Sequence, residues 1–430
     1  MVLSVPLVKV TSGEDSMTAV WGGAVRRSFT GKAALGALAA LLLAACSGAQ
    51  ATQGGGGPGG AVASPSAVAP SSAAPPVVSI TPGAGAGSVR PDAAVAVQVQ
   101  RGALTGVQVR SAKGEQVKGQ LDADGGSWHS TGALTVATTY TVTATASGVD
   151  GAAPVTKTST FTTLKPAAYN GARLNVGDDQ TVGVGMPIII RFDRAVRNTD
   201  AVLKALTVTT SPQVEGSWHW MEASQWVGRN TEVWFRPKEY WPAGTKVTMT
   251  ANLGGVELSP GVWGRRTYST RFTVGDAVID TVDMAKHTLT MRKNGAVVRT
   301  IPVTTGKPGP QWSTRNGIKV ISEKAAELRM DSSSIGVKDQ ADPDFYNEIE
   351  HWTMRLTYSG EFLHARPGSE WAFGKQNVSH GCTGMSMADA KWLFDHSRIG
   401  DVVVYTGGTR ALESGNGLTA WQTSYDKWSA

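Results

Sequence analysis

The sequence predicts a mainly β protein, with two tandem Ig-like β-sandwiches followed by a third β domain that carries a short helix. Short runs of alternating apolar and polar residues, such as 95–99 and 140–144, are separated by Gly and Asp clusters throughout residues 77–275. That spacing is typical of sandwiches. The tetrapeptide Gly-Ser-Trp-His occurs at 126–129 and again at 216–219, which indicates that one module is repeated.

The N-terminal segment, residues 1–45, is predicted to be a secretory signal. A basic stretch, 26–32, precedes an apolar run, 33–45, that is too short to cross a bilayer as a helix. The run ends in Leu-Ala-Ala-Cys, which resembles the bacterial lipobox, so Cys46 is expected to be acylated and to become the mature N-terminus. An ordinary cleaved signal with an incidental cysteine is the alternative, and Met17 is an alternative translation start.

Composition divides the rest of the chain into a linker, three domains and a tail. Residues 46–76 are rich in Gly, Ala, Ser and Pro and are predicted to form a flexible tether. The two Ig-like domains are assigned to 77–165 and 166–275, and the third domain to 276–406. The tail, 407–430, carries two tryptophans and a tyrosine near its end, so we expect it to dock onto the body of the protein.

Charge and histidine placement argue against two classes of partner. The formal net charge is +6, but Lys and Arg gather in no block, so nucleic-acid binding is not expected. His129 and His219 have no companions at metal-ligand spacing, so we expect neither a metal site nor a cofactor.

The third domain contains three local patterns. An Asn-Gly pair at 294–295 joins the apolar runs 289–292 and 296–299 and predicts a hairpin, because this dipeptide accepts positive φ angles. Residues 386–397 are predicted to be helical, since a serine at the start is followed three residues later by an aspartate. The run 401–405 is predicted to be a final buried strand.

Cys382 lies in the stretch Ser-His-Gly-Cys at 379–382, directly ahead of the predicted helix. A thiol becomes a good nucleophile beside a base, and His364, at the end of an apolar run eighteen residues upstream, is the candidate. The amides of residues 382–384 can donate hydrogen bonds to an oxyanion. An inert buried thiol is the alternative that the residues alone leave open.

His364 and the Ser-His-Gly-Cys stretch, with fourteen residues between them, resemble the signature of the L,D-transpeptidase (YkuD-type) family. Residues 304–308 and 313–317 resemble that family's first conserved stretch. This resemblance covers residues 276–406, and the lipobox, paired Ig-like modules and Trp-bearing tail resemble the family's multi-domain actinobacterial branch.

The resemblance implies a YkuD-type β-sandwich with the cysteine on a loop leading into a helix. It implies that Cys382 attacks the diaminopimelate carbonyl at position 3 of a donor stem tetrapeptide and expels D-alanine. An acceptor amine then completes a 3→3 cross-link in peptidoglycan. His364 is the implied general base, oriented by the carbonyl of Ala365. Ser379 and His380 are implied supports around the loop, and His380 as the base itself is the alternative.

Further residues match family positions that contact the donor or cover it. Tyr346, Ser359 and Gly360 match donor-contacting positions, and the polar stretch that begins at Met330 resembles the lid over the active site. Gly384 stands two residues after the cysteine, where the family usually carries Asn or Arg. A side-chain contact to substrate is therefore expected to be missing there. The alternative is that Gly384 holds a positive φ angle that the loop needs.

The resemblance also implies partners and a location. These are peptidoglycan stem peptides, a lipid bilayer reached through acylated Cys46, and carbapenem β-lactams as covalent inhibitors. The implied location is the outer face of the plasma membrane, with a role in cell-wall organisation and cell shape. Two other functions remain as alternatives: a non-catalytic wall-binding lipoprotein, and a sortase-like thiol transpeptidase, whose Thr-Leu-x-Thr-Cys strand residues 379–382 do not match.

Overall fold

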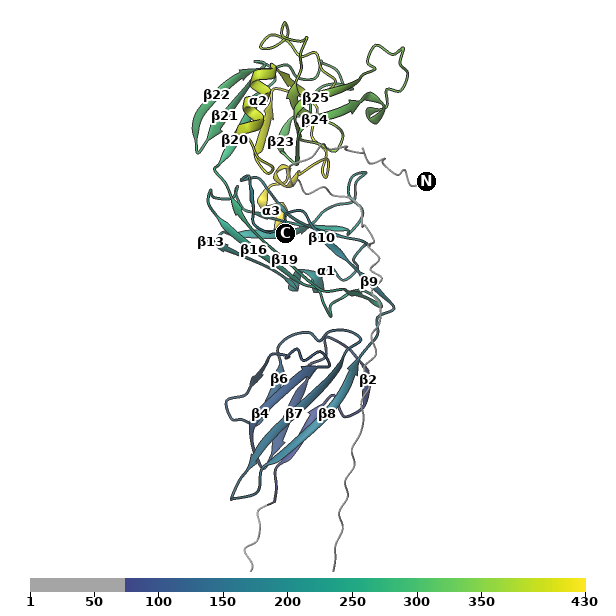
Figure 1. The fold of residues 1–430 in the computed structure, drawn as a ribbon, viewed down its shortest axis with the longest axis vertical. Helices are drawn as coiled ribbons and strands as arrows, with labels where there is room; N and C mark the ends of the chain where they lie inside the picture. The colour runs from purple at the N-terminus through teal and green to yellow at the C-terminus, as the bar shows by residue number, and fades with distance from the viewer. Residues whose placement is uncertain (1–73) are drawn as a thin grey trace, which may run out of the picture. The chain divides into compact units, whose positions relative to one another are not determined.

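The computed structural model describes residues 74–430 (Figure 1). The predicted signal, Cys46 and most of the predicted tether lie outside the described residues. The described chain is mainly β, which confirms the predicted fold class. No helix in this part of the chain has the length and hydrophobicity that crossing a membrane requires.

The first sandwich consists of two four-stranded sheets. One has the order β1 (Val77–Thr81), β3 (Ala96–Gln100), β6 (Ser127–Ser130), β5 (Gly119–Leu121), and the other β2 (Ala86–Val89), β8 (Val155–Thr163), β7 (Thr139–Gly148), β4 (Gly102–Ser111). Every second side chain of β7 from Tyr140 to Ala146 is buried, so the alternation in the sequence forms the core face of the sheet.

The second sandwich has two four-stranded sheets and a three-stranded one. Their orders are β10 (Ala172–Leu174), β12 (Ile188–Phe192), β15 (Glu232–Pro237), β14 (Gly216–Trp220); β11 (Gln180–Val182), β19 (Thr267–Val274), β16 (Lys246–Asn252), β13 (Leu206–Ser211); and β17 (Glu257–Ser259), β18 (Val262–Gly264), β9 (Ala168–Asn170). A short helix, α1 (Thr199–Lys204), precedes β13. The Trp-His pair of each Gly-Ser-Trp-His repeat lies in a strand, β6 in the first sandwich and β14 in the second.

The third domain contains a five-stranded and a four-stranded sheet (Figure 1). The orders are β22 (Ala296–Pro302), β21 (Thr288–Lys293), β20 (Val278–Asp283), β28 (Val402–Thr406), β23 (Gly317–Val320); and β24 (Glu323–Asp331), β25 (Asn347–Arg355), β26 (Phe362–Ala365), β27 (Thr383–Met385). Side chains of both sheets, among them Leu289 and Leu363, share one buried core. The 3-10 helix η1 (Ser332–Ile335) lies between β24 and β25.

The local patterns of this domain fold as predicted. Asn294 and Gly295, with φ angles of 51° and 84°, form the turn between β21 and β22. Helix α2 spans Met387–His396, and the side chain of Ser386 caps it by accepting a hydrogen bond from the Asp389 amide at 3.1 Å.

The C-terminal tail packs against the second sandwich. It forms the 3-10 helix η2 (Ala420–Gln422) and the short helix α3 (Tyr425–Trp428). The indole Nε1 of Trp421 donates to the carbonyl of Gly185 at 2.8 Å, and that of Trp428 donates to Ser217 at 3.0 Å. The ring of His219 stacks on Trp428, so this histidine serves packing.

Candidate active site

The loop that carries Cys382 is fixed by hydrogen bonds on both sides. The hydroxyl of Ser379 donates to the Cys382 carbonyl at 2.6 Å and accepts from the Gly381 amide at 3.1 Å. The hydroxyl of Thr314 donates to the Gly381 carbonyl at 2.8 Å. Gly381 has a φ angle of 131°, which an L side chain rarely adopts. The glycine therefore permits the bend that presents the thiol.

His364 lies at the end of β26 and is 2% exposed. Its Nδ1 atom is 2.7 Å from the Ala365 carbonyl oxygen and 3.0 Å from Oε2 of Glu350 on β25. Because both acceptors meet Nδ1, the other ring nitrogen is left free, and Cys382 is near enough to act on the pKa of the imidazole. The sulfur also lies 3.4 Å from the carbonyl oxygen of Gly360.

The electrostatics of this pair favour a charged imidazole. Burial acts to lower the pKa of His364, but its hydrogen bonds to Cys382 and Glu350 outweigh burial and raise the pKa to about 10. Burial conversely acts to raise the pKa of Glu350, and the hydrogen bond and charge of His364 hold it below its usual range. A protonated imidazole between a carboxylate and a sulfur stabilises the thiolate, the nucleophilic form of cysteine.

Glu350 was not among the residues predicted from sequence. It lies fourteen residues before His364, in a stretch with no motif around it. Its carboxylate meets the imidazole because β25 and β26 are neighbours in the sheet.

The side chain of His380 contacts the segment between β24 and β25. Its Nε2 atom is 2.9 Å from Oδ1 of Asp344, and its ring stacks on Tyr346 with 5.5 Å between centroids. Asp344 also accepts from Nζ of Lys307 at 2.7 Å, and this contact, followed by that of His380, lowers the pKa of its carboxyl to about 2. His380 therefore links the segment between β24 and β25 to the cysteine loop.

Of the expected lid and donor-contacting residues, Met330 borders the segment between β24 and β25, and Tyr346 belongs to it. Met330 is half-buried near the end of β24, and the Ser332 hydroxyl accepts from the Tyr346 amide at 3.1 Å. Burial and then the charge of Cys382 raise the pKa of the Tyr346 hydroxyl, so it stays protonated and able to donate. A Cβ atom placed on Gly360 would lie 3.6 Å from the side chain of Ile335, which shows how closely the segment approaches.

Ser359 is bound to the tail. Its hydroxyl accepts from Nδ2 of Asn416 at 2.9 Å and lies 3.1 Å from the Thr357 hydroxyl, while its amide donates to Oδ1 of Asn416 at 2.9 Å. Asn416 was not predicted, and its contact with the turn before β26 links the tail to the site.

Gly384 corrects two expectations. It lies on β27 opposite His364, and its amide donates to the Thr304 carbonyl at 2.9 Å. That amide is therefore unavailable to an oxyanion, contrary to the expected set 382–384. Gly384 also lies outside the positive φ region, so the backbone explanation for this glycine is wrong.

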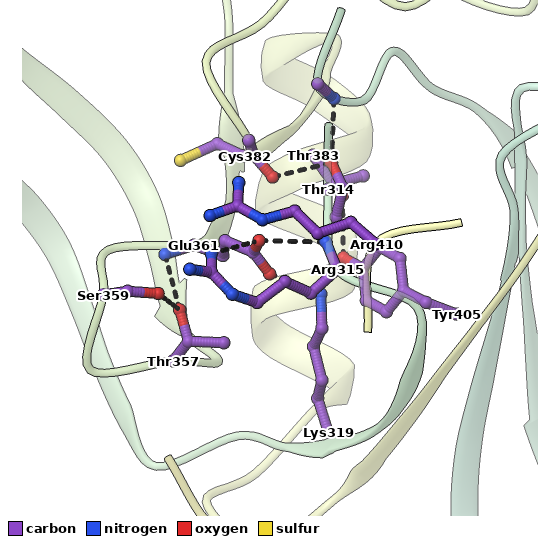
Figure 2. A network of polar contacts seen from close by, with 12 residues as sticks. Thr314, Arg315, Lys319, Thr357, Ser359, Glu361, Cys382, Thr383, Tyr405 and Arg410 are labelled. Atoms are coloured by element: carbon purple, nitrogen blue, oxygen red, sulfur yellow. Dashed lines mark hydrogen bonds and ion pairs between the residues drawn. The ribbon is translucent and has the colours of Figure 1, made fainter. Parts of the chain in front are cut away.

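A buried ionic cluster lies beside the cysteine loop (Figure 2). Glu361 accepts from the amide and Nη1 of Arg315, both at 3.0 Å, and from Nζ of Lys319 at 2.5 Å. Burial lowers the pKa of Lys319, although the Glu361 carboxylate offsets part of that effect. Nζ of Lys319 lies 3.6 Å from the centre of the Tyr405 ring. The hydroxyl of Tyr405 lies 2.7 Å from that of Thr383, the residue after the cysteine. This cluster fixes the strands from which the loop projects.

The arrangement suits acyl transfer through a thiol, because nucleophile, acid–base imidazole and orienting carboxylate meet at one end of β26. Among residues 74–430, no group of three or more His, Cys, Asp or Glu side chains has a geometry that could hold a metal ion.

Comparisons with known proteins match both halves of this description. The family model of the bacterial Ig domain matches residues 86–257, and that of the L,D-transpeptidase catalytic domain matches residues 278–404.

Individual relatives match over most of the chain. L,D-transpeptidase 2 of Mycobacterium tuberculosis is 38% identical over 80% of this chain and 82% of its own length. L,D-transpeptidase 5 of the same species is 33% identical over 82% of this chain and 76% of its own length. A solved structure of LD transpeptidase LdtMt1 in complex with imipenem is 29% identical and covers 56% of this chain and 100% of that chain, with a TM-score of 0.46.

Proposed function

Because this chain belongs to the L,D-transpeptidase family of peptidoglycan cross-linking enzymes, we propose that Cys382 forms an acyl-enzyme with a donor stem tetrapeptide. The thiolate adds to the diaminopimelate carbonyl at position 3, and the bond to the terminal D-alanine breaks. An amine of an acceptor stem then displaces the sulfur and completes a 3→3 cross-link.

His364 moves the proton in both half-reactions. Its imidazolium gives a proton to the departing amine of D-alanine, and the neutral ring then takes one from the attacking acceptor amine. Glu350 and the Ala365 carbonyl hold the ring in one tautomer throughout. The observation that carries this proposal is the buried His364 imidazole, held by Glu350 and the Ala365 carbonyl beside Cys382.

Muropeptide analysis with a purified tetrapeptide donor tests the proposal. Cys382→Ala and His364→Ala are each expected to abolish 3→3 products, because nucleophile and acid–base residue act as one unit. His380→Ala is expected to leave a folded but weaker enzyme, since His380 contacts Asp344 rather than the thiol. Retained activity in His364→Ala together with its loss in His380→Ala would reverse these assignments.

A β-lactam test separates catalysis from wall binding alone. We expect a carbapenem to acylate Cys382, because its strained carbonyl is an acyl donor for an activated thiolate. Mass analysis should find one adduct on Cys382 in Cys46→Ala, which removes the other thiol, and none in Cys382→Ala. An unmodified Cys382 after prolonged incubation favours the non-catalytic alternative.

We also propose that acylated Cys46 anchors the exported protein to the outer face of the plasma membrane. The Leu-Ala-Ala-Cys sequence at 43–46 supports this assignment. A single acyl chain gives only marginal binding, so stable attachment needs two chains on this residue. Cys46→Ala should move the protein to the soluble fraction, and unchanged membrane association in that variant contradicts the proposal.

A further inference from the structure

The space beside Gly384 is filled by the side chain of Arg366. A Cβ atom placed on Gly384 would lie 2.9 Å from Cβ and 3.0 Å from Cδ of Arg366. The first of these distances is essentially never seen for a real Cβ atom and the second is unusually short, so the aliphatic part of Arg366 occupies the room that a side chain at 384 would need. The glycine and the arginine are therefore complementary.

Arg366 leaves the sheet on the same face as His364. The two residues are separated by Ala365 at the end of β26, and the Arg366 amide extends the ladder by donating to the Met385 carbonyl at 2.9 Å. Successive side chains of an extended strand point to opposite faces, so residues two apart share one face. The guanidinium is thus carried on the face where His364 meets Cys382.

The guanidinium adds a positive charge to the site. Burial and His364 act more strongly on the pKa of Glu350, and burial and Cys382 on that of Tyr346, but the charge of Arg366 acts to lower both and so reaches these two residues. Within residues 74–430 its side-chain hydrogen bond is the one from Nε to the Ser369 hydroxyl at 3.1 Å. The side chain is half-buried, and its two terminal nitrogens have no hydrogen bond to any of residues 74–430.

We propose that the Arg366 guanidinium binds a carboxylate of the donor stem peptide. This contact would replace the one that Gly384, which has no side chain, cannot make. A guanidinium is suited to this task because its planar fork pairs with both oxygens of a carboxylate. The inference rests on the proposed function, since it assigns a specificity residue to that donor. Two such groups belong to the residues that flank the bond to be broken, the C-terminal carboxylate and the side-chain carboxylate of diaminopimelate, and the proposal is confined to these two.

Steady-state kinetics of the full chain with three donors test the proposal. One donor carries both carboxylates, one has a C-terminal carboxamide, and one has a carboxamide on the diaminopimelate side chain. Arg366→Gln should raise KM for the first donor about tenfold or more with little change in kcat, because a hydrogen bond to a charged group is lost. Arg366→Lys should recover part of the loss. The donor in which an amide replaces the bound carboxylate should have the same KM in wild type and in Arg366→Gln. That donor identifies which of the two carboxylates Arg366 binds.

Arg292→Gln is the matched control, since it removes one positive charge from an exposed position on β21. The alkylation rate of Cys382 and the melting temperature report whether Arg366→Gln remains folded. An equal rise in KM for all three donors overturns the proposal, because the arginine then only supports packing. If Arg366→Gln is misfolded, the KM values of the wild type alone test the proposal. Equal wild-type KM values for the acid donor and both amide donors overturn the proposal. A wild-type protein inactive on every donor overturns the proposed function as well.

Discussion

Oε2 of Glu350 lies 3.0 Å from Nδ1 of His364, and both side chains are buried. The two residues come from neighbouring strands, and the Ala365 carbonyl meets the same ring nitrogen at 2.7 Å. The carbonyl alone is enough to select the tautomer. The carboxylate adds a negative charge, which stabilises the imidazolium that pairs with Cys382.

Glu350→Gln should lower kcat about tenfold to a hundredfold, since it removes an interaction of about 1.5–3 kcal/mol between charged hydrogen-bonding groups. The Ala365 carbonyl still holds the ring, so the loss should be smaller than in His364→Ala. Glu327→Gln makes the same change on β24 beside the exposed His351 and is expected to be silent. Equal activity of the two variants would mean that the carboxylate plays no part in catalysis.

The sequence predicts Cys382 and His364 but not Glu350, and the difference has a physical cause. The first two belong to a pattern in which residue type and spacing both carry information. Glu350 comes near His364 because β25 and β26 are neighbouring strands, and a contact between two strands leaves no local signal in the sequence. Turn and cap chemistry, in contrast, is local, so the Asn-Gly hairpin and the Ser386 cap were predictable.

Cys382 should be alkylated faster in the wild type than in His364→Ala at every pH between about 6.5 and 8.5. The pKa of His364 is raised to about 10, so its imidazolium persists throughout this interval and places a positive charge beside the sulfur. In His364→Ala the rate should rise about tenfold per pH unit, as for free thiols, which ionise near pH 8.5. Iodoacetamide labelling followed by mass analysis measures both profiles. Equal rates in the two proteins would show that the imidazole does not activate the thiol.

Glu361→Gln should lower the free energy of unfolding of the catalytic domain by about 3–5 kcal/mol, because Lys319 is left buried without its counter-charge. Calorimetry should record a lower melting temperature for this domain. Glu323→Gln is the control: it breaks the exposed pair with Arg355, which has an N–O distance of 2.8 Å, and surface pairs contribute about 1 kcal/mol or less. A similar small effect in both variants contradicts the role given to the buried cluster.

The buried cluster also marks a limit of sequence reasoning. A lysine in the alternating run 317–320 is expected to face solvent, as most lysines do. Lys319 is instead 1% exposed, because Glu361, the residue before β26 of the other sheet, supplies its counter-charge. The pairing depends on how two sheets stack, which the one-dimensional pattern does not contain.

Gly384→Ala should weaken donor binding without changing the reactivity of the thiol. The backbone of Gly384 accepts alanine, since its φ angle is not positive, but the new Cβ would lie 2.9 Å from Cβ of Arg366 and 3.3 Å from Thr304. Arg366 must therefore move, and KM for the tetrapeptide should rise about three- to tenfold, the equivalent of one hydrogen bond of about 0.5–1.5 kcal/mol. Gly384→Asn should have at least the same effect, because it adds further atoms in the same space.

A double-mutant cycle determines whether Arg366 transmits this effect. In Arg366→Ala the space beside Gly384 is partly vacated, so adding Gly384→Ala should change KM little beyond the single variant. The alkylation rate of Cys382 should stay near that of wild type in all three proteins, because the contact between His364 and Cys382 does not pass through either residue. Additive changes in KM would mean that Gly384 acts on the donor independently of Arg366. A harmless Gly384→Ala would mean that the position of Arg366 does not depend on the glycine.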